Sequence, residues 1–362
     1  MNYIFEVNFA VFSIFASLLI SEVIGSAVLL LFYDAAKDKV LEYIIPIWEV
    51  TGTFAAFWVV TGDMAYPTLL VPVATIFGAL VTIFLITLVC RNASIVFGEF
   101  ISRRKWLDAK KLYRGYAIST MLLGVTALVL LSSLVSGAGV LSNGTNALTT
   151  PFDLGAWASQ GGSLLFVIGT LLIGVGLAPV FFDIRPFAKK FSLLTVLGVV
   201  VSIGAFYSYS SSLVTVYFAV PTLITLLVNL LYFPKKTSVI VTNKAAFLAV
   251  MSIVIFSLQF LVYPKFAGQT LPIDALTTSG PMADVFYETT WAGAALLAVM
   301  LVVYFTVVSR QKSLSMKGGS HAHPTDSGMA RLSPASDGQG QDSAPLSAPA
   351  TPAPGVQSNN VE

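Results

Sequence analysis

The chain has 362 residues, of which 56% are hydrophobic and only 10% are charged, and its mean hydropathy is +0.82. A water-soluble chain of this size cannot bury so large an apolar surface. Apolar runs of about 20 residues recur between positions 9 and 309, and each is long enough to cross a membrane as a helix. Runs such as 191–205 lack the alternation of apolar and polar residues that a membrane-spanning β-barrel shows. The sequence therefore predicts an all-α integral membrane protein that crosses the membrane many times.

The inventory of reactive residues excludes several kinds of site. Cys90 is the only cysteine, so this chain alone supplies no disulfide and no thiolate cluster. Both histidines, His321 and His323, follow the last apolar run, so no histidine within the membrane can ligate a haem, copper or zinc. The net charge of +2 leaves no large basic domain for nucleic acid. We therefore expect this chain to bind no cofactor by itself.

The hydropathy pattern predicts nine transmembrane helices, arranged as two four-helix bundles plus one peripheral helix. In chain order they are expected at residues 9–33, 45–66, 69–95, 113–137, 160–182, 191–209, 212–233, 245–263 and 287–309. The first run contains Glu22 and follows no basic segment, so it is predicted to be a retained helix rather than a cleaved signal peptide. Residues 1–312 are expected to form this membrane domain. The remaining residues, 313–362, are rich in Ser, Pro, Ala and Gly and are expected to form a disordered cytoplasmic tail.

The positions of the lysines and arginines predict how the chain is oriented in the membrane. They are concentrated in the first, third, fifth and seventh loops and at the start of the tail, whereas the intervening loops contain only Lys265. Short loops rich in basic residues stay in the cytoplasm. This distribution predicts an amino terminus outside and a carboxyl terminus inside.

Four charged residues lie within the predicted helices or close to their ends, where a charge is costly unless it is paired or functional. Glu22 lies about halfway along the helix predicted at 9–33. It is either a carboxylate that relays protons or binds ions, or a protonated acid hydrogen-bonded to a neighbouring helix. Glu49 opens the second predicted helix, where it either takes up protons or complements the helix dipole. Arg91 and Glu99 flank the end of the third helix and are expected to be a snorkelling arginine and its partner carboxylate.

Three glycines repeat every seven residues along the helix predicted at 160–182. They are Gly162, Gly169 and Gly176. This spacing places them on one face of the helix, and a face without side chains allows another helix to approach closely. The pattern therefore predicts tight helix packing rather than nucleotide binding, which would require a strand, a turn and a helix.

Short motifs near the two ends of the chain resemble subunit II of the cytochrome bd quinol oxidases. The resemblance covers about residues 9–312, with specific motifs only at its two ends. Pro46-Ile47-Trp48-Glu49 is similar to the Pro-x-Trp-acid opening of that family's second helix. The other similar segments are the aromatic-proline pair Tyr66-Pro67, the helix-ending arginine Arg91, the acid-aromatic pair within 97–100, and the loop before the last helix, which includes Tyr263-Pro264 and Asp274. After Trp48 this chain departs from the family's usual Asp-Gly-Asn-Gln-Val-Trp, so it resembles a divergent member.

The resemblance implies a haem-free subunit II in the plasma membrane of a prokaryote. The b-type and d-type haems and the site of quinol oxidation would belong to a partner, subunit I. Subunit II would support that partner, hold a structural quinone, and supply acids for proton uptake from the cytoplasm. The acid after the tryptophan, here Glu49, would take up the protons, and Glu22, Arg91 and Glu99 would assist. Membrane lipid and a small accessory subunit are further expected partners.

Two other functions fit the same residues. A secondary transporter would also use an intramembrane acid such as Glu22, although no pair of Gly/Pro-broken helices marks matching positions in two halves of the chain. A haem-free, quinone-binding anchor of another respiratory complex is the third possibility. Haem that copurifies with the chain would favour the oxidase, whereas substrate flux in liposomes would favour the transporter. An iron–sulfur partner would favour the anchor.

Overall fold

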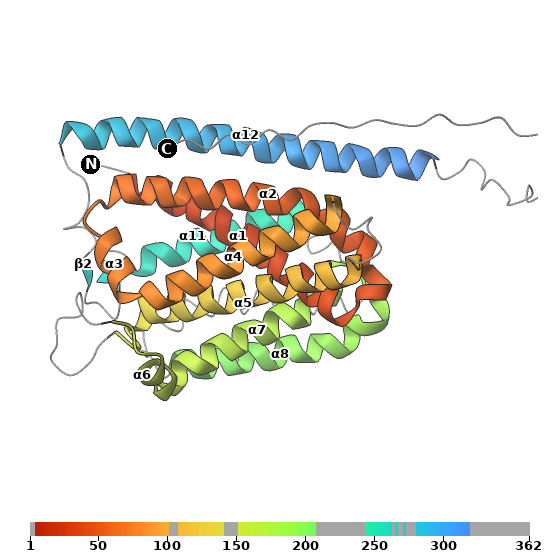
Figure 1. Cartoon of the computed structure of the whole chain (residues 1–362), viewed down its shortest axis with the longest axis horizontal. Coiled ribbons are helices and arrows are strands. Elements are labelled where there is room, and N and C mark those ends of the chain that lie inside the picture. The colour runs from red at the N-terminus through yellow and green to blue at the C-terminus, as the bar shows by residue number, and fades with distance from the viewer. Residues whose placement is uncertain are drawn as a thin grey trace, which may run out of the picture. The chain divides into compact units, whose positions relative to one another are not determined.

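The computed structural model describes residues 4–100, 108–140, 151–207, 243–262, 265–266, 271–272 and 280–318. The chain divides into two units, residues 1–309 and 310–362. The helices, labelled in Figure 1, are α1 (Ile4–Leu31), α2 (Tyr33–Ala65), α3 (Leu70–Ile76), α4 (Gly78–Phe100), α5 (Ala109–Ser136), α6 (Leu154–Ser159), α7 (Gly161–Phe181), α8 (Arg185–Tyr207), α11 (Lys244–Val262) and α12 (Pro281–Gly318). Two short strands, β1 (Lys265–Phe266) and β2 (Leu271–Pro272), pair antiparallel between α11 and α12.

Within the described residues, six helices are long and apolar enough to cross a membrane, namely α1, α2, α4, α5, α7 and α12. Shorter apolar helical segments occupy Lys190–Ala205 in α8 and Lys244–Ser257 in α11. The chain is thus a multi-pass, α-helical membrane protein. Every predicted span except 212–233 overlaps one of these helices, and that span lies outside the described residues. The count of nine helices and their division into two bundles stay predictions. The disordered tail at 313–362 also stays a prediction, since the structure describes only residues 313–318 of it, as the end of α12.

Two predicted boundaries were wrong. The helix expected from residue 45 begins at Tyr33, so Lys37 and Lys39 lie in a helix rather than in a loop. No proline or glycine interrupts residues 33–45, and Asp34 near the helix start bonds Lys110 of α5 at 2.9 Å. The single helix expected at 69–95 is broken at Phe77, between α3 and α4.

The break between α3 and α4 is accommodated by another part of the chain. The backbone N–H of Phe152 donates to the carbonyl of Ile76 at 2.8 Å, and the Phe77 and Phe152 rings lie 5.6 Å apart. A helix in a membrane can be interrupted only where such a partner satisfies the freed backbone group. Phe152 comes just before α6. The Asp153 side chain caps the start of α6, because it accepts hydrogen bonds from the backbone N–H groups of Gly155 and Ala156.

Helix α1 lies at the centre of the fold, where it contacts α2, α5, α7 and α11. Polar side chains join it to its neighbours. Gln259 of α11 donates to Ser13 at 2.7 Å, the Ser17 and Ser252 hydroxyls lie 2.8 Å apart, and Asn8 donates to Thr61 of α2 at 3.1 Å. Hydrogen bonds of this kind stabilise helix contacts in a membrane, because lipid cannot satisfy a polar group.

Several helix ends meet at one end of the bundle. Asp34 pairs with Lys110, Phe32 packs on Phe187 with ring centroids 4.7 Å apart, and the Lys244 ammonium lies 3.6 Å from the centre of the Phe181 ring. The starts of α2, α5, α8 and α11 therefore lie together, at the ends of the loops in which the sequence concentrates its basic residues. The side of the membrane that this end faces is still a prediction.

Helices α7 and α8 lie side by side because glycines remove the side chains between them (Figure 1). A Cβ added at Gly169 would lie 2.9 Å from the carbonyl of Gly198, and one added at Gly176 would lie 2.6 Å from the backbone nitrogen of Thr195. Real Cβ atoms do not come so close to backbone atoms. This confirms the predicted close packing at Gly169 and Gly176.

Replacing Gly176 by alanine is expected to push α8 away from α7. The obstacle is backbone, which cannot rotate aside as a side chain can, so we expect a loss of about 1–3 kcal/mol in stability. Gly174→Ala is the matched control, since a Cβ there meets nothing within 4 Å. The measurement is the midpoint of thermal unfolding of both variants in the same detergent. Equal midpoints for the two variants would contradict the glycine contact.

Candidate functional site

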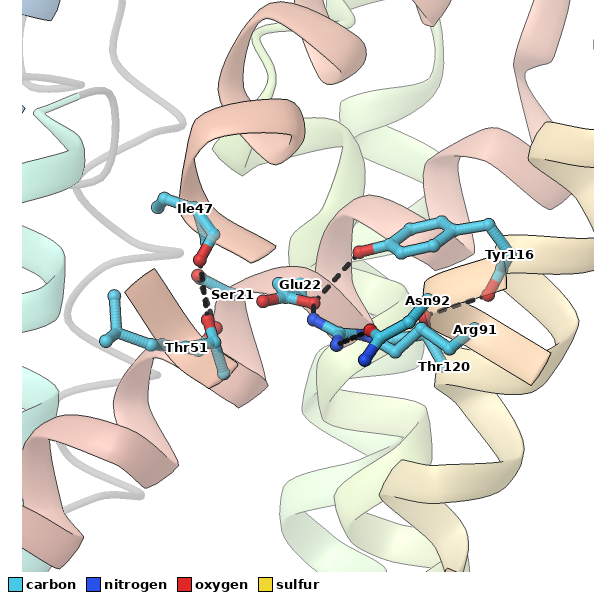
Figure 2. Close-up of polar contacts among 9 residues, drawn as sticks. Ser21, Glu22, Ile47, Thr51, Arg91, Asn92, Tyr116 and Thr120 are labelled. Carbon is cyan, nitrogen blue, oxygen red and sulfur yellow. Dashed lines mark hydrogen bonds and ion pairs between the residues drawn. The ribbon is translucent and has the colours of Figure 1, made fainter. Parts of the chain in front are cut away.

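A charged cluster is buried in the middle of the fold, where α1, α4 and α5 meet. It consists of Glu22 from α1, Arg91 from α4 and Tyr116 from α5 (Figure 2). Glu22 and Tyr116 are 0% exposed and Arg91 is 1% exposed. Charged residues are rarely so buried unless they are paired, and in membrane-spanning helices they mark functional sites by default.

One oxygen of the Glu22 carboxylate receives both of the cluster's strong hydrogen bonds. Arg91 Nη2 donates to Glu22 Oε2 in a salt bridge, and the Tyr116 hydroxyl donates to the same oxygen at 2.9 Å. The guanidinium carbon of Arg91 lies 5.6 Å from the centre of the Tyr116 ring, and Arg91 Nη1 donates to Asn92 Oδ1 at 2.9 Å. The arginine is therefore fixed by a carboxylate, an amide and an aromatic face together.

Two glycines on the helices around Glu22 allow these side chains to meet. A Cβ on Gly25 of α1 would lie 2.6 Å from Ile44 of α2, and a Cβ on Gly124 of α5 would lie 2.8 Å from Val23 of α1. Because neither glycine has a side chain, α1 approaches α2 closely at Gly25 and α5 approaches α1 closely at Gly124. Both glycines lie within a few turns of the cluster. The close approach of α5 brings the Tyr116 hydroxyl within hydrogen-bonding distance of Glu22.

The second carboxylate oxygen is different from the first. Within the described part of the chain, Glu22 Oε1 and Arg91 Nε have no hydrogen-bond partner, although both are buried. Buried polar atoms without a partner are rare and call for an explanation such as ordered water or a catalytic role. A carboxylate oxygen without a partner in the described residues keeps lone pairs that a water molecule or another hydrogen-bond donor can use. No three His, Cys, Asp or Glu side chains come together in the described ranges to form a metal site.

The structure joins two of the predicted site residues and separates the others. Glu22 and Arg91 form the cluster, but the predicted pairing of Arg91 with Glu99 is wrong. Arg91 points into the fold instead of snorkelling, whereas Glu99 is exposed near the end of α4 and accepts a hydrogen bond from the Tyr113 hydroxyl. The two residues are more than two helical turns apart, too far for a direct bond along one helix.

Glu49 lies in the middle of α2 rather than at its start. A helix dipole acts mainly on the first and last turns, so the predicted complement to the dipole is wrong for this residue. Its side chain is exposed, on the opposite side of α2 from buried Ile47 and Val50. Glu49 is therefore not part of the Glu22 cluster, and its role in proton uptake stays a prediction.

The remaining motif residues occupy structural positions. Pro46 lies inside α2 without ending it, and Trp48 is half-buried against the core. Pro67 follows the end of α2, as predicted, and Tyr66 is the buried residue at that end, with its N–H donating to Gly62 O at 2.9 Å. Asp274 lies outside the described residues.

Tyr116 is the member of the cluster that sequence reasoning missed. It lies in a helix rich in apolar residues and looks like one more aromatic residue. The available signal is its hydroxyl, since a tyrosine buried in a membrane helix needs a hydrogen-bond partner. A search for tyrosines on the inner faces of helices would have found it.

Among the comparisons with known proteins, the match comes from the solved structures. No protein-family model matches this sequence, and no curated protein matches it. Among solved structures, the chain is similar to a chain in the structure of bd oxidase from Geobacillus thermodenitrificans, with a TM-score of 0.60. The match covers 84% of this chain and 97% of that chain, at 16% sequence identity. This chain therefore has a bd oxidase-like fold.

Removing one partner of the buried pair is expected to destabilise the protein strongly. Glu22→Leu leaves the Arg91 charge buried and unpaired, and such a change costs about 3–5 kcal/mol. The double variant Glu22→Leu with Arg91→Met removes both charges and should recover most of that loss. The midpoint of thermal unfolding of the protein in gentle detergent measures both effects.

Glu99→Gln is the matched control for this pair. It neutralises an acid that is exposed and is not bonded to Arg91, so its effect is expected to be small. A midpoint for Glu22→Leu no lower than that for Glu99→Gln would contradict a stabilising role for the ion pair. Failure of the double variant to recover would show that packing, rather than charge, sets the cost.

Proposed function

We propose that this chain is the haem-free subunit II of a cytochrome bd-type terminal quinol oxidase. It supports a haem-bearing subunit I, which oxidises quinol and reduces oxygen to water. The observation that carries the proposal is the bd oxidase-like fold, which extends over 97% of the compared oxidase chain. The motif at Pro46–Glu49 adds support, because it is similar to the opening of the second helix in that family's subunit II.

The residues of this chain do not fit a haem of their own. Haem iron is most often held by histidine, and the two histidines here lie in the segment beyond α12. We therefore place the b-type and d-type haems in the partner subunit. A structural quinone is a further ligand that the proposal includes for the assembled complex.

The outer face of α2 supports the existence of a partner. Glu49, Gly52 and Thr53 are exposed in the middle of this membrane-spanning helix. A carboxylate facing lipid at that depth is costly, whereas a protein partner can hydrogen-bond it. In the assembled oxidase, subunit I covers this face, and Glu49 lies at the boundary between the subunits. A small accessory subunit is a further partner in the proposal.

Reduction of oxygen to water consumes protons, which must cross a region of low dielectric constant through titratable groups. We propose that these protons come from the cytoplasm, with the amino terminus of this chain outside the plasma membrane and its carboxyl terminus inside. Glu49 receives them at the subunit boundary. Glu22 receives protons inside this chain, at the carboxylate oxygen that is not bonded to Arg91. Glu99 lies at the end of α4, where it is exposed.

Purification of the tagged chain from its native membrane tests the proposal directly. We expect haem bands in the reduced-minus-oxidised optical spectrum, together with a second polytopic subunit identified by its mass. A haem-free chain that is stable and monodisperse alone would overturn the oxidase assignment. Substrate flux in liposomes would then favour a secondary transporter, and an iron–sulfur partner would favour the anchor of another respiratory complex.

Glu49→Gln is expected to slow proton uptake in the assembled complex. The amide keeps the size of the side chain but cannot exchange a proton as a carboxylate does, so we expect a roughly tenfold or larger loss. The measurements are oxygen consumption with quinol and proton uptake from the cytoplasmic side of vesicles. Asp63→Asn is the matched control, since Asp63 is also an exposed acid of α2 but lies near the carboxyl end of that helix. Unchanged rates in Glu49→Gln would remove Glu49 from the route.

A further inference from the structure

Lys244, the first residue of α11, places its ammonium group among three aromatic rings. Its Nζ lies 3.6 Å from the centre of the Phe181 ring, 4.7 Å from that of Phe182 and 5.9 Å from that of Tyr43. All three distances lie within the roughly 6 Å over which a ring attracts a cation. We call Tyr43, Phe181 and Phe182 the ammonium cage. Several rings around one cation form the kind of site that recognises organic ammonium ions.

The rings of the cage also contact one another. Tyr43 of α2 packs edge-on against Phe181 and Phe182 at centroid distances of 5.5 and 5.8 Å, and the two phenylalanine rings lie 5.0 Å apart. Phe181 ends α7 and Phe182 follows it, where the Ile184 N–H donates to Pro179 O at 2.7 Å and reverses the chain. All three rings are buried. The cage is therefore built by α2 and α7, and its shape does not depend on the lysine alone.

The place of Lys244 in α11 is otherwise unfavourable for a positive charge. The Asn243 side chain accepts the Ala246 N–H at 3.3 Å and so caps the start of α11, directly before the lysine. A cation in the first turn of a helix is repelled by the positive end of the helix dipole. The negative faces of the cage rings offset this repulsion. The contact therefore gives a physical reason for a lysine at this position.

The same face of α11 carries a second contact with α7. Phe247 lies three residues after Lys244, so the two side chains share one side of the helix. The Phe247 ring lies 4.9 Å from that of Phe181 and packs edge-on against it. Further along α11, Ser252 and Gln259 bond α1. Helix α11 is thus bound to α2 and α7 at its start and to α1 along its length.

The cage is accessible from the side on which the lysine lies. Lys244 is half-buried, whereas the rings of the cage are buried. Water therefore reaches part of the lysine side chain but not the ring faces behind it. Removal of that side chain would leave an opening through which a small ion in solution can reach the rings.

We propose that the ammonium cage is a binding site for organic ammonium ions, and that Lys244 is the ion that this chain supplies to it. With the Lys244 ammonium in the cage, the start of α11 is held against α2 and α7. Without a cation in the cage, the start of α11 opens more readily. The proposal goes beyond the proposed function and does not depend on it, because all of its contacts lie within this chain.

Fluorination of the Phe181 ring tests whether the ring face attracts the cation. Incorporation of phenylalanine with one, two or three ring fluorines weakens the negative face while the ring keeps its place. We expect amide hydrogen exchange in residues 245–250 to quicken stepwise, by about fivefold in total, in the intact purified protein with any subunits that accompany it. The same series at Phe54 is the matched control, since that ring is also 1% exposed and no described cation lies over it. Equal exchange rates across the Phe181 series would overturn the proposal.

Substitution of Lys244 separates the charge from the length of the side chain. Lys244→Gln should quicken exchange in residues 245–250 by about fivefold, whereas Lys244→Arg should keep the wild-type rate, because a guanidinium is also attracted to ring faces. Lys111→Gln is the matched control, since Lys111 is an exposed lysine in the first turn of α5. Faster exchange in Lys244→Gln without any response to ring fluorination would assign the lysine to another partner, such as a lipid phosphate, and would overturn the cage.

An added ammonium ion tests the cage as a binding site. Lys244→Ala removes the resident cation, and propylammonium chloride supplies the part of the side chain that is missing. Propylammonium should slow exchange in residues 245–250 of Lys244→Ala, whereas 1-propanol, which has a similar size and no charge, and sodium chloride should not. Equal effects of the three additives, or no effect of propylammonium, would overturn the site. Haem and oxygen consumption play no part in these measurements, so failure of the proposed function leaves their outcome unchanged.

Discussion

The fold depends on one electrostatic constraint, which is that the charge of Arg91 must be neutralised inside the membrane. Its partner Glu22 is 69 residues away in the sequence, and both side chains are almost completely buried. An unpaired charge there is strongly unfavourable, so the pair is satisfied only when α1 and α4 are adjacent and in register. Tyr116 extends the same requirement to α5. The ion pair and this hydrogen bond thereby fix the positions of three helices together.

Close packing makes that pair geometrically accessible. Lipid is as apolar as a leucine side chain, so helices in a membrane associate through van der Waals contact and hydrogen bonds rather than through the hydrophobic effect. Gly25 and Gly124 bring α2 and α5 against α1, beside Glu22. Ser13 and Ser17 then hold α11 to another part of α1. The helix that carries the buried acid is thus fixed on several sides.

The sequence predicts the helices better than it predicts the site. A backbone in lipid must satisfy its own hydrogen bonds, so long apolar runs reliably become helices. The errors arise where other parts of the chain intervene, as at Phe77, where Phe152 satisfies the broken turn. Glu22 and Arg91 attract attention singly because charges in a membrane are rare. Their pairing, and the contact of Tyr116 with Glu22, depend on contacts between distant segments that periodicity does not encode.

Helix α2 separates an exposed face that carries acids from a buried face that carries hydroxyl groups. Glu42 and Glu49 lie on its exposed face, whereas Tyr43, Ile47 and Thr51 lie on its buried face towards α1. Glu49 lies at the surface of this chain, where a protein partner can hydrogen-bond it. Glu22 instead lies inside the chain, bonded to Arg91 and Tyr116. The roles proposed for the two acids differ accordingly, since Glu49 would act across the boundary with a partner and Glu22 inside this chain.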